Sequence, residues 1–263
     1  MKHKKFLMTP MILLVMLSAS IVQDDQTELF STGKSREQFA QEMAVLITKA
    51  WKSWQDRVEI NDVDVEGSRG MLMPGDISEP VLTSEEILKS FDKVGRSQAG
   101  INAAKAVADA LEEGMRLWQR GYTHSNIPFP QGASCSYTMP PSNNVPVLVS
   151  SGTSPGDSAM TESALYNYML YRAPDDDEDV LVVFRACAKS IALCFRKWKE
   201  SCSIVGILAS GGIAPQPAPL GTGPGPVSGA KGSGGKLIGP YLDGDLLLDN
   251  MLKYLRGHRK SVS

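Results

Sequence analysis

The sequence has few of the residues from which enzymes build reactive centres. Only three histidines and four cysteines occur among 263 residues. No two cysteines have the C-x-x-C spacing that is typical of zinc sites and redox motifs. Formal charges nearly balance, at a net −2, and the basic residues form no extended patch from which counterion release could drive nucleic-acid binding. We therefore expect no metal, no cofactor and no nucleic-acid partner.

Long apolar runs are also missing, apart from a short one near the N-terminus. Three lysines precede an apolar stretch over 11–17, and small residues follow up to Ser20. This order is typical of a secretory signal peptide, whereas a membrane span needs about 20 apolar residues. Residues 1–20 are therefore predicted to be a signal peptide cleaved after Ser20. If they are retained, they form an apolar segment that is the expected route to a membrane. We expect an extracytoplasmic location: periplasm, cell envelope or secreted.

Hydrophobic periodicity predicts a mainly α-helical fold. Apolar residues recur at helical spacing over 35–57, over 83–119 with a break near Gly95, and over 159–171, 180–202 and 242–257. Stretches that indicate strands are few and short, at 59–67 and 145–150. We therefore expect packed amphipathic helices with a few short β-strands and long loops rich in glycine and proline.

Two segments resemble each other without gaps, which indicates an internal duplication. Residues 47–67 align on 191–211. The matched aromatic positions are the core candidates: Trp51 with Phe195, and Trp54 with Trp198. We predict two helical halves, 21–150 and 151–263, whose aromatic helices bury each other. Chance similarity between two amphipathic helices is the alternative.

The stretch 209–240 is rich in glycine and proline and low in charge. Loops of this length inside a compact domain are usually functional or disordered. Its apolar side chains would be poorly placed in a free tether, so they are the interface candidates: Ile213, Leu220, Val227, Leu237 and Ile238. A flexible spacer is the alternative.

The cysteines allow a disulfide if the protein is exported. Cys187 and Cys194 lie on one predicted helix, about 10.5 Å apart along its axis, so they cannot bridge each other. Cys135 is placed to pair with Cys202 at the end of that helix. Buried free thiols are the alternative.

One motif has the form of a catalytic centre. Residues 152–156, GTSPG, match the G-x-S-x-G nucleophile elbow, with Ser154 as nucleophile. His124 is the one histidine inside the predicted fold. However, Pro155 has no backbone N–H to donate to an oxyanion hole. We therefore place an envelope serine hydrolase below a non-enzymatic role.

Two further motifs fail on spacing. In GAKGSGGKL, the phosphate-loop pattern would need glycine at Ala230 and a serine or threonine at Leu237. The stretch DVDVEG begins like a calcium loop, but the twelfth position is Met73 instead of a glutamate. Neither motif is expected to bind a ligand.

Charged residues cluster at the ends of the predicted helices. The acidic run 175–179 opens the longest helix, and Arg196 and Lys199 lie near its end. Lys253 opens a basic cluster at the end of the last helix. Both signs of charge suit the helix dipole, so these residues are assigned no ligand.

A structural or assembly subunit is the function that these features favour. It would work outside the cytoplasm in a homo- or hetero-oligomer, with other protein subunits as partners. The alternatives are a structural protein of a virion or contractile phage tail, in which residues 1–20 are retained, and the serine hydrolase.

Cleavage after Ser20 has a measurable consequence. We expect intact-mass analysis of the protein from its native cells to give a chain that begins at Ile21. That chain loses three lysines, so its formal net charge falls from −2 to −5. An intact Met1 in the assembled protein would contradict export and favour the virion alternative.

Overall fold

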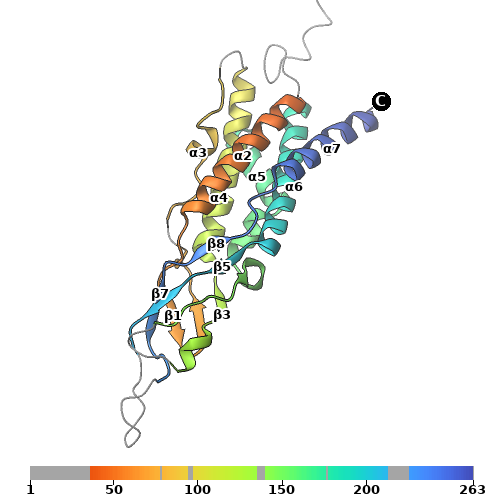
Figure 1. Ribbon diagram of the computed structural model, residues 1–263. Coiled ribbons are helices and arrows are strands. Elements are labelled where there is room, and N and C mark those ends of the chain that lie inside the picture. The colour runs from red at the N-terminus through yellow and green to blue at the C-terminus, as the bar shows by residue number, and fades with distance from the viewer. Residues whose placement is uncertain are drawn as a thin grey trace, which may run out of the picture.

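The computed structural model describes residues 36–77, 79–93, 97–134, 140–175, 177–212 and 225–262. The predicted signal peptide, Cys135, Ile213 and Leu220 lie outside the described residues. The described part is elongated, with long helices at one end and the strands at the other (Figure 1).

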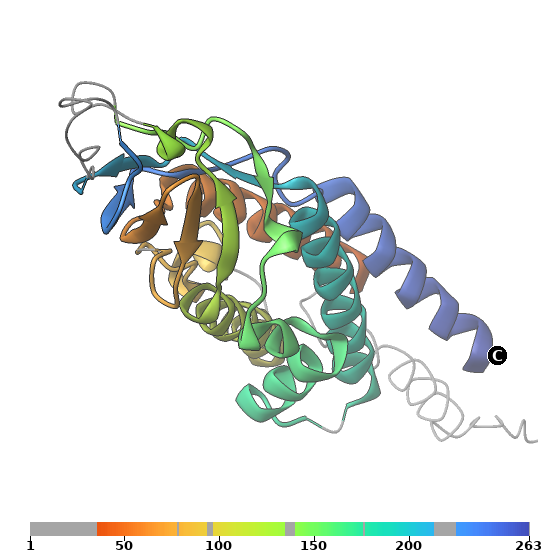
Figure 2. The same ribbon diagram turned by 90° about the horizontal axis from the view of Figure 1, so that it is seen from below.

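Five long helices build one end of the described structure. They are α2 (Arg36–Arg57), α4 (Gln98–Gly121), α5 (Glu162–Arg172), α6 (Glu178–Ser201) and α7 (Gly244–Val262). The short helix α3 (Ser84–Leu88) packs on α4 and begins at Thr83, whose side chain accepts a hydrogen bond from the Glu86 N–H. Helix α6 lies between α5 and α7 (Figure 2). Within the described residues, no helix is both long and apolar enough to span a bilayer.

The expectation of a mainly α fold is wrong, because the strands form two antiparallel sheets and the fold is mixed α/β. The five-stranded sheet has the order β3-β2-β1-β7-β6, and the three-stranded sheet has the order β4-β5-β8. The strands are β1 (Val63–Glu66), β2 (Arg69–Leu72), β3 (His124–Pro128), β4 (Val147–Leu148), β5 (Ser203–Val205), β6 (Leu208–Ser210), β7 (Ala230–Ser233) and β8 (Lys236–Ile238). The stretches 59–67 and 145–150, which the sequence predicts as strands, contain β1 and β4. The other strands show too little alternation of polar and apolar residues to be detected from the sequence.

The glycine-rich stretch 209–240 is not simply the long loop that its composition predicts, because it contains β7 and β8. Strand β7 pairs with β1 on one side and β6 on the other. A Cβ atom on Gly232 would lie 2.5 Å from Ile207 Cγ2, and one on Gly235 would lie 2.5 Å from Ile207 Cγ1. Glycine at these positions therefore allows the strands and Ile207 to approach closely.

Residues 141–143 pair with residues 206–209, which include most of β6 at one edge of the five-stranded sheet. The Asn143 N–H donates to the Ile207 carbonyl, and the Gly206 N–H donates to the Asn143 carbonyl. The Asn143 side-chain amide donates to the carbonyl of Pro128 at the end of β3. This buried asparagine therefore links β3 to the chain that leads into β6, the two outer strands of the sheet.

An aromatic cluster joins α2, α4 and α6. The ring centroids of Trp51 and Trp198 are 5.0 Å apart, and those of Trp54 and Trp198 are 5.7 Å apart. Trp118 of α4 packs against Trp198 at 5.5 Å. The four core candidates of the sequence analysis, Trp51, Trp54, Phe195 and Trp198, are all buried here.

Helices α2 and α6 run parallel. Arg36 forms an ion pair with Asp179 at their N-terminal ends, and Trp198 Nε1–H donates to Gln55 Oε1 near their C-terminal ends. Both pairs join residues 143 positions apart, close to the offset of 144 between the two aligned segments. Helix α2 leads into β1, which pairs with β7, and α6 leads through β5 into β6, which pairs with β7 on its other side. Strands from 21–150 and from 151–263 share both sheets, so the two predicted halves have a common core.

The tryptophan cluster offers a matched pair of substitutions. Trp198→Phe removes the donor to buried Gln55, and an unpaired buried acceptor costs about 1–3 kcal/mol. Trp51→Phe removes the same indole portion, but the Trp51 N–H has no acceptor among the described residues. We expect urea denaturation to show a free energy of unfolding about 1–3 kcal/mol lower for Trp198→Phe than for Trp51→Phe. Equal losses would mean that this hydrogen bond contributes nothing.

Candidate functional site

Ser154 caps a helix in this structure. It precedes the 3-10 helix η3 (Pro155–Met160), and its hydroxyl accepts a hydrogen bond from the Gly156 N–H. The same hydroxyl donates to the Trp118 carbonyl at 2.8 Å. Its side chain is buried, and Asp157 completes the capping box by accepting from the Ser154 N–H. The hydroxyl proton is therefore already committed to a backbone acceptor.

His124 contacts a different serine. Its Nε2 lies 2.9 Å from Ser151 Oγ, and its Nδ1 accepts from the Asn126 N–H. The Ser151 hydroxyl donates to the Leu148 carbonyl at 2.6 Å. These partners assign the proton to Nε2, so the imidazole donates to Ser151 and does not accept its proton. Neither serine is therefore arranged as a nucleophile with a histidine base.

The interface candidates are divided by the fold. Val227, which precedes β7, and Leu237 of β8 are buried within the single chain. Their assignment to an interface stays a prediction. Ile238 is 42% exposed. Ile213 and Leu220 lie outside the described residues.

Three of the four cysteines lie in the described structure as buried free thiols. Burial raises the pKa of Cys187, Cys194 and Cys202 to about 12. A thiol with so high a pKa stays protonated at neutral pH and is a poor nucleophile. Cys135, the proposed partner of Cys202, lies outside the described residues.

No group of three histidine, cysteine or acidic side chains in the described ranges is placed to hold a metal ion. The acidic run before α6 has structural contacts instead. Asp177 caps the helix by accepting from the Asp179 N–H, and Asp179 pairs with Arg36. Both carboxylates thus stabilise the start of α6.

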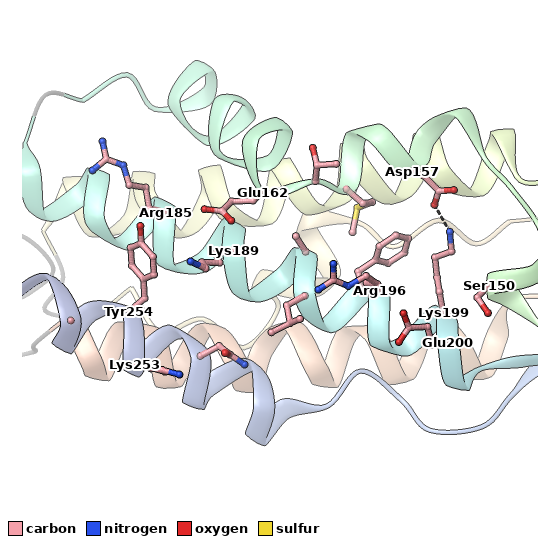
Figure 3. A pocket seen from close by; sticks show the side chains of 17 residues that line it. Ser150, Asp157, Glu162, Arg185, Lys189, Arg196, Lys199, Glu200, Lys253 and Tyr254 are labelled. Atoms are coloured by element: carbon pink, nitrogen blue, oxygen red, sulfur yellow. Dashed lines mark hydrogen bonds and ion pairs between the residues drawn. The ribbon is translucent and has the colours of Figure 1, made fainter.

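A groove of about 1080 Å³ runs along α6, with η3 and α5 on one side and α7 on the other (Figure 3). We call it the α6 groove. Its lining on α6 extends from Arg185 to Glu200, about 22 Å along the helix axis. A groove of this length can hold a peptide segment.

Positive charge predominates in the α6 groove. Its cations are Arg185, Lys189, Arg196, Lys199 and Lys253, and its carboxylates are Asp157, Glu162 and Glu200. Lys199 pairs with Asp157 at 2.5 Å, which ties α6 to η3. Lys189 lies over the Tyr254 ring of α7, 5.0 Å from its centroid. Among the described residues, Lys189, Arg196 and Lys253 have no carboxylate within 4.0 Å.

The floor of the α6 groove is apolar. Ala192 and Leu193 are half-buried, and Phe195 and Met160 are buried. Phe195 stacks on Trp198, so the floor is continuous with the tryptophan cluster. An apolar floor below unpaired cations can hold an acidic segment that carries apolar side chains.

The groove is not evident from the sequence, where Arg196 and Lys199 suit the dipole of the longest helix and Lys253 belongs to the end of the last helix. The available signal was the spacing of Arg185, Lys189 and Arg196, which places all three on one face of the helix. That face becomes a groove only because α5 and α7 pack on either side of it.

No family model, curated protein or solved structure matches this chain. Its function is therefore inferred from the geometry and chemistry of its own residues.

The environment of His124 predicts a pH-dependent stability. Burial lowers the pKa of His124 from its usual value of 6.5, so below that pH the unfolded chain binds a proton that the folded chain excludes. Folding free energy contributed by neutral His124 is present above about pH 6.5 and is lost as the pH falls. We expect His124→Gln to lose less stability than wild type between about pH 7 and about pH 5 in urea denaturation. Identical pH profiles would contradict this role.

Proposed function

We propose that this protein is a non-enzymatic structural or assembly subunit that holds a segment of a neighbouring protein subunit in the α6 groove. The observation that carries the proposal is the unpaired positive charge of Lys189, Arg196 and Lys253 above the apolar floor of a groove that extends about 22 Å along α6. Apolar contact in such a groove supplies affinity, and the charges fix the orientation of the bound segment.

A protein segment suits this groove better than a nucleic acid. A nucleic acid carries phosphates at regular spacing, so some of them would lie beside Asp157, Glu162 or Glu200, whereas a protein segment can carry its carboxylates only where the unpaired cations lie. Of the two aromatic residues that line the groove, Phe195 is buried and the Tyr254 ring is covered on one face by Lys189, so neither offers an open platform for a row of stacked bases. The groove therefore favours a partner that carries both carboxylates and apolar side chains.

The candidate nucleophiles support a non-enzymatic role. Ser154 caps η3, Ser151 receives a hydrogen bond from His124, and the three described thiols are buried and protonated. The extracytoplasmic location remains part of the proposal on the strength of residues 1–20, and a virion is the alternative location.

The native mass of the protein tests the proposal. We expect the protein isolated from its native cells to have a mass above that of one 28.4 kDa chain. Lys189→Glu combined with Arg196→Glu should reduce the mass to that of a single chain, because like charges then face the bound segment. The circular dichroism spectrum should not change, since both side chains are exposed.

Lys49→Glu is the matched control, because Lys49 is exposed on α2 and does not line the groove. This variant should keep the wild-type mass. A wild-type particle of one chain would overturn the proposal, as would a particle that the groove variant leaves intact. Labelling by a serine-directed probe that disappears in Ser154→Ala would favour the hydrolase instead.

A further inference from the structure

The α6 groove specifies the chemistry of what binds there. Lys189 and Arg196 on α6 and Lys253 on α7 have no carboxylate partner in the described structure. Leu193 lies between the two α6 cations and is only half-buried. A complementary segment therefore carries several carboxylates together with apolar side chains, over a length of about 22 Å.

The chain itself contains a segment of this composition. Residues 21–35, IVQDDQTELFSTGKS, carry Asp24, Asp25 and Glu28 against one lysine. Leu29 and Phe30 follow the acidic residues directly. Fifteen residues span the groove whether the chain is helical, at about 22 Å, or extended, at about 50 Å. Both the charge and the length of this segment match the groove.

The position of α2 favours a segment from another copy. Helix α2 packs against α6 and α7 but contributes no residue to the groove. The chain before Arg36 therefore starts outside the groove, at the end of α2 that Asp179 holds against α6. To reach its own groove, this segment would have to pass around α6 or α7, whereas a segment from a neighbour enters directly.

We infer that the α6 groove binds residues 21–35 of a second copy of this chain, an inference that rests on the proposed function. Each copy then offers one groove and one segment, so the contact is heterologous and links copies head to tail. Asp24, Asp25 and Glu28 neutralise the groove cations, and Leu29 and Phe30 cover its apolar floor.

Binding in trans can be measured with a synthetic, fluorescein-labelled peptide of residues 21–35. Its anisotropy should rise to saturation when the purified chain is added at concentrations where the chain is a single copy. Lys189→Glu with Arg196→Glu should weaken binding about tenfold or more, and Lys49→Glu should not change it. A peptide with Asp24→Asn, Asp25→Asn and Glu28→Gln should bind as weakly to the wild-type groove.

Two variants with reversed charges, one in the α6 groove and one in residues 21–35, show whether the groove of one copy binds the segment of another. One variant carries Lys189→Glu and Arg196→Glu in the groove, and the other carries Asp24→Lys and Asp25→Lys in the segment. Each should remain a single copy alone, because like charges meet in the contact. An equimolar mixture should associate, because the reversed segment finds the reversed groove, and its mass should rise with concentration.

The outcomes separate the inference from the proposed function. A wild-type chain that assembles while the peptide does not bind and the mixture stays dissociated overturns the inference, and the groove then holds a segment of another subunit. A wild-type chain that stays a single copy at every concentration but binds the peptide also overturns it, since the segment then occupies its own groove. A native particle of one chain overturns the proposed function itself.

Discussion

The packing of Trp198 against the tryptophans of α2 and α4 is the contact on which the other features depend. All four tryptophans of the chain lie in this cluster, and two of their N–H groups donate to buried glutamines, Gln55 and Gln119. Ring contacts alone tolerate rotation of a helix, whereas the directional bond from Trp198 to Gln55 sets the angle of α6 about its axis, and the bond from Trp54 to Gln119 fixes α2 against α4. With one face of α6 fixed against the cluster, the face that carries Lys189 and Arg196 is held outward, and Phe195 forms the boundary between the two.

The strand end of the molecule limits where a partner can bind. Strand β7 lies between β1, which follows α2, and β6, which follows α6 and β5. Gly232 and Gly235 leave room there for Ile207. Val227 and Leu237 thereby enter the core. The composition of 209–240 suggests a segment that contacts neighbouring subunits. From residue 225 on, this stretch instead joins the two helix and strand units of one chain. The α6 groove, between α5 and α7, is the surface to which the proposed function assigns a partner.

The charged residues of the α6 groove divide into a pair that stabilises the fold and cations that the fold does not need. Lys199 and Asp157 form a half-buried ion pair that belongs to the fold, because it fastens α6 to η3. Lys189 and Arg196 are exposed, so neither is needed to complete the core. Exposed charges are screened by salt and contribute little within one chain, but they select and orient a partner of opposite charge. Such a groove can stay open in a single copy and still be specific in a complex.

The sequence by itself determined the helices, because their signals are local: apolar residues recur every three or four positions over 35–57 and 180–202, and Thr83 lies three residues before Glu86, whose N–H it caps. It also showed, through Pro155, that GTSPG lacks an oxyanion-hole donor. Only the tertiary structure decided the sheets, since Val63 pairs with Gly232 far along the chain and most strands are too short to show their own period. The same holds for the groove, whose cations belong to α6 and α7 and whose wall includes η3. A helix face becomes a binding site only when other helices pack beside it, and that packing depends on contacts between residues distant in the sequence.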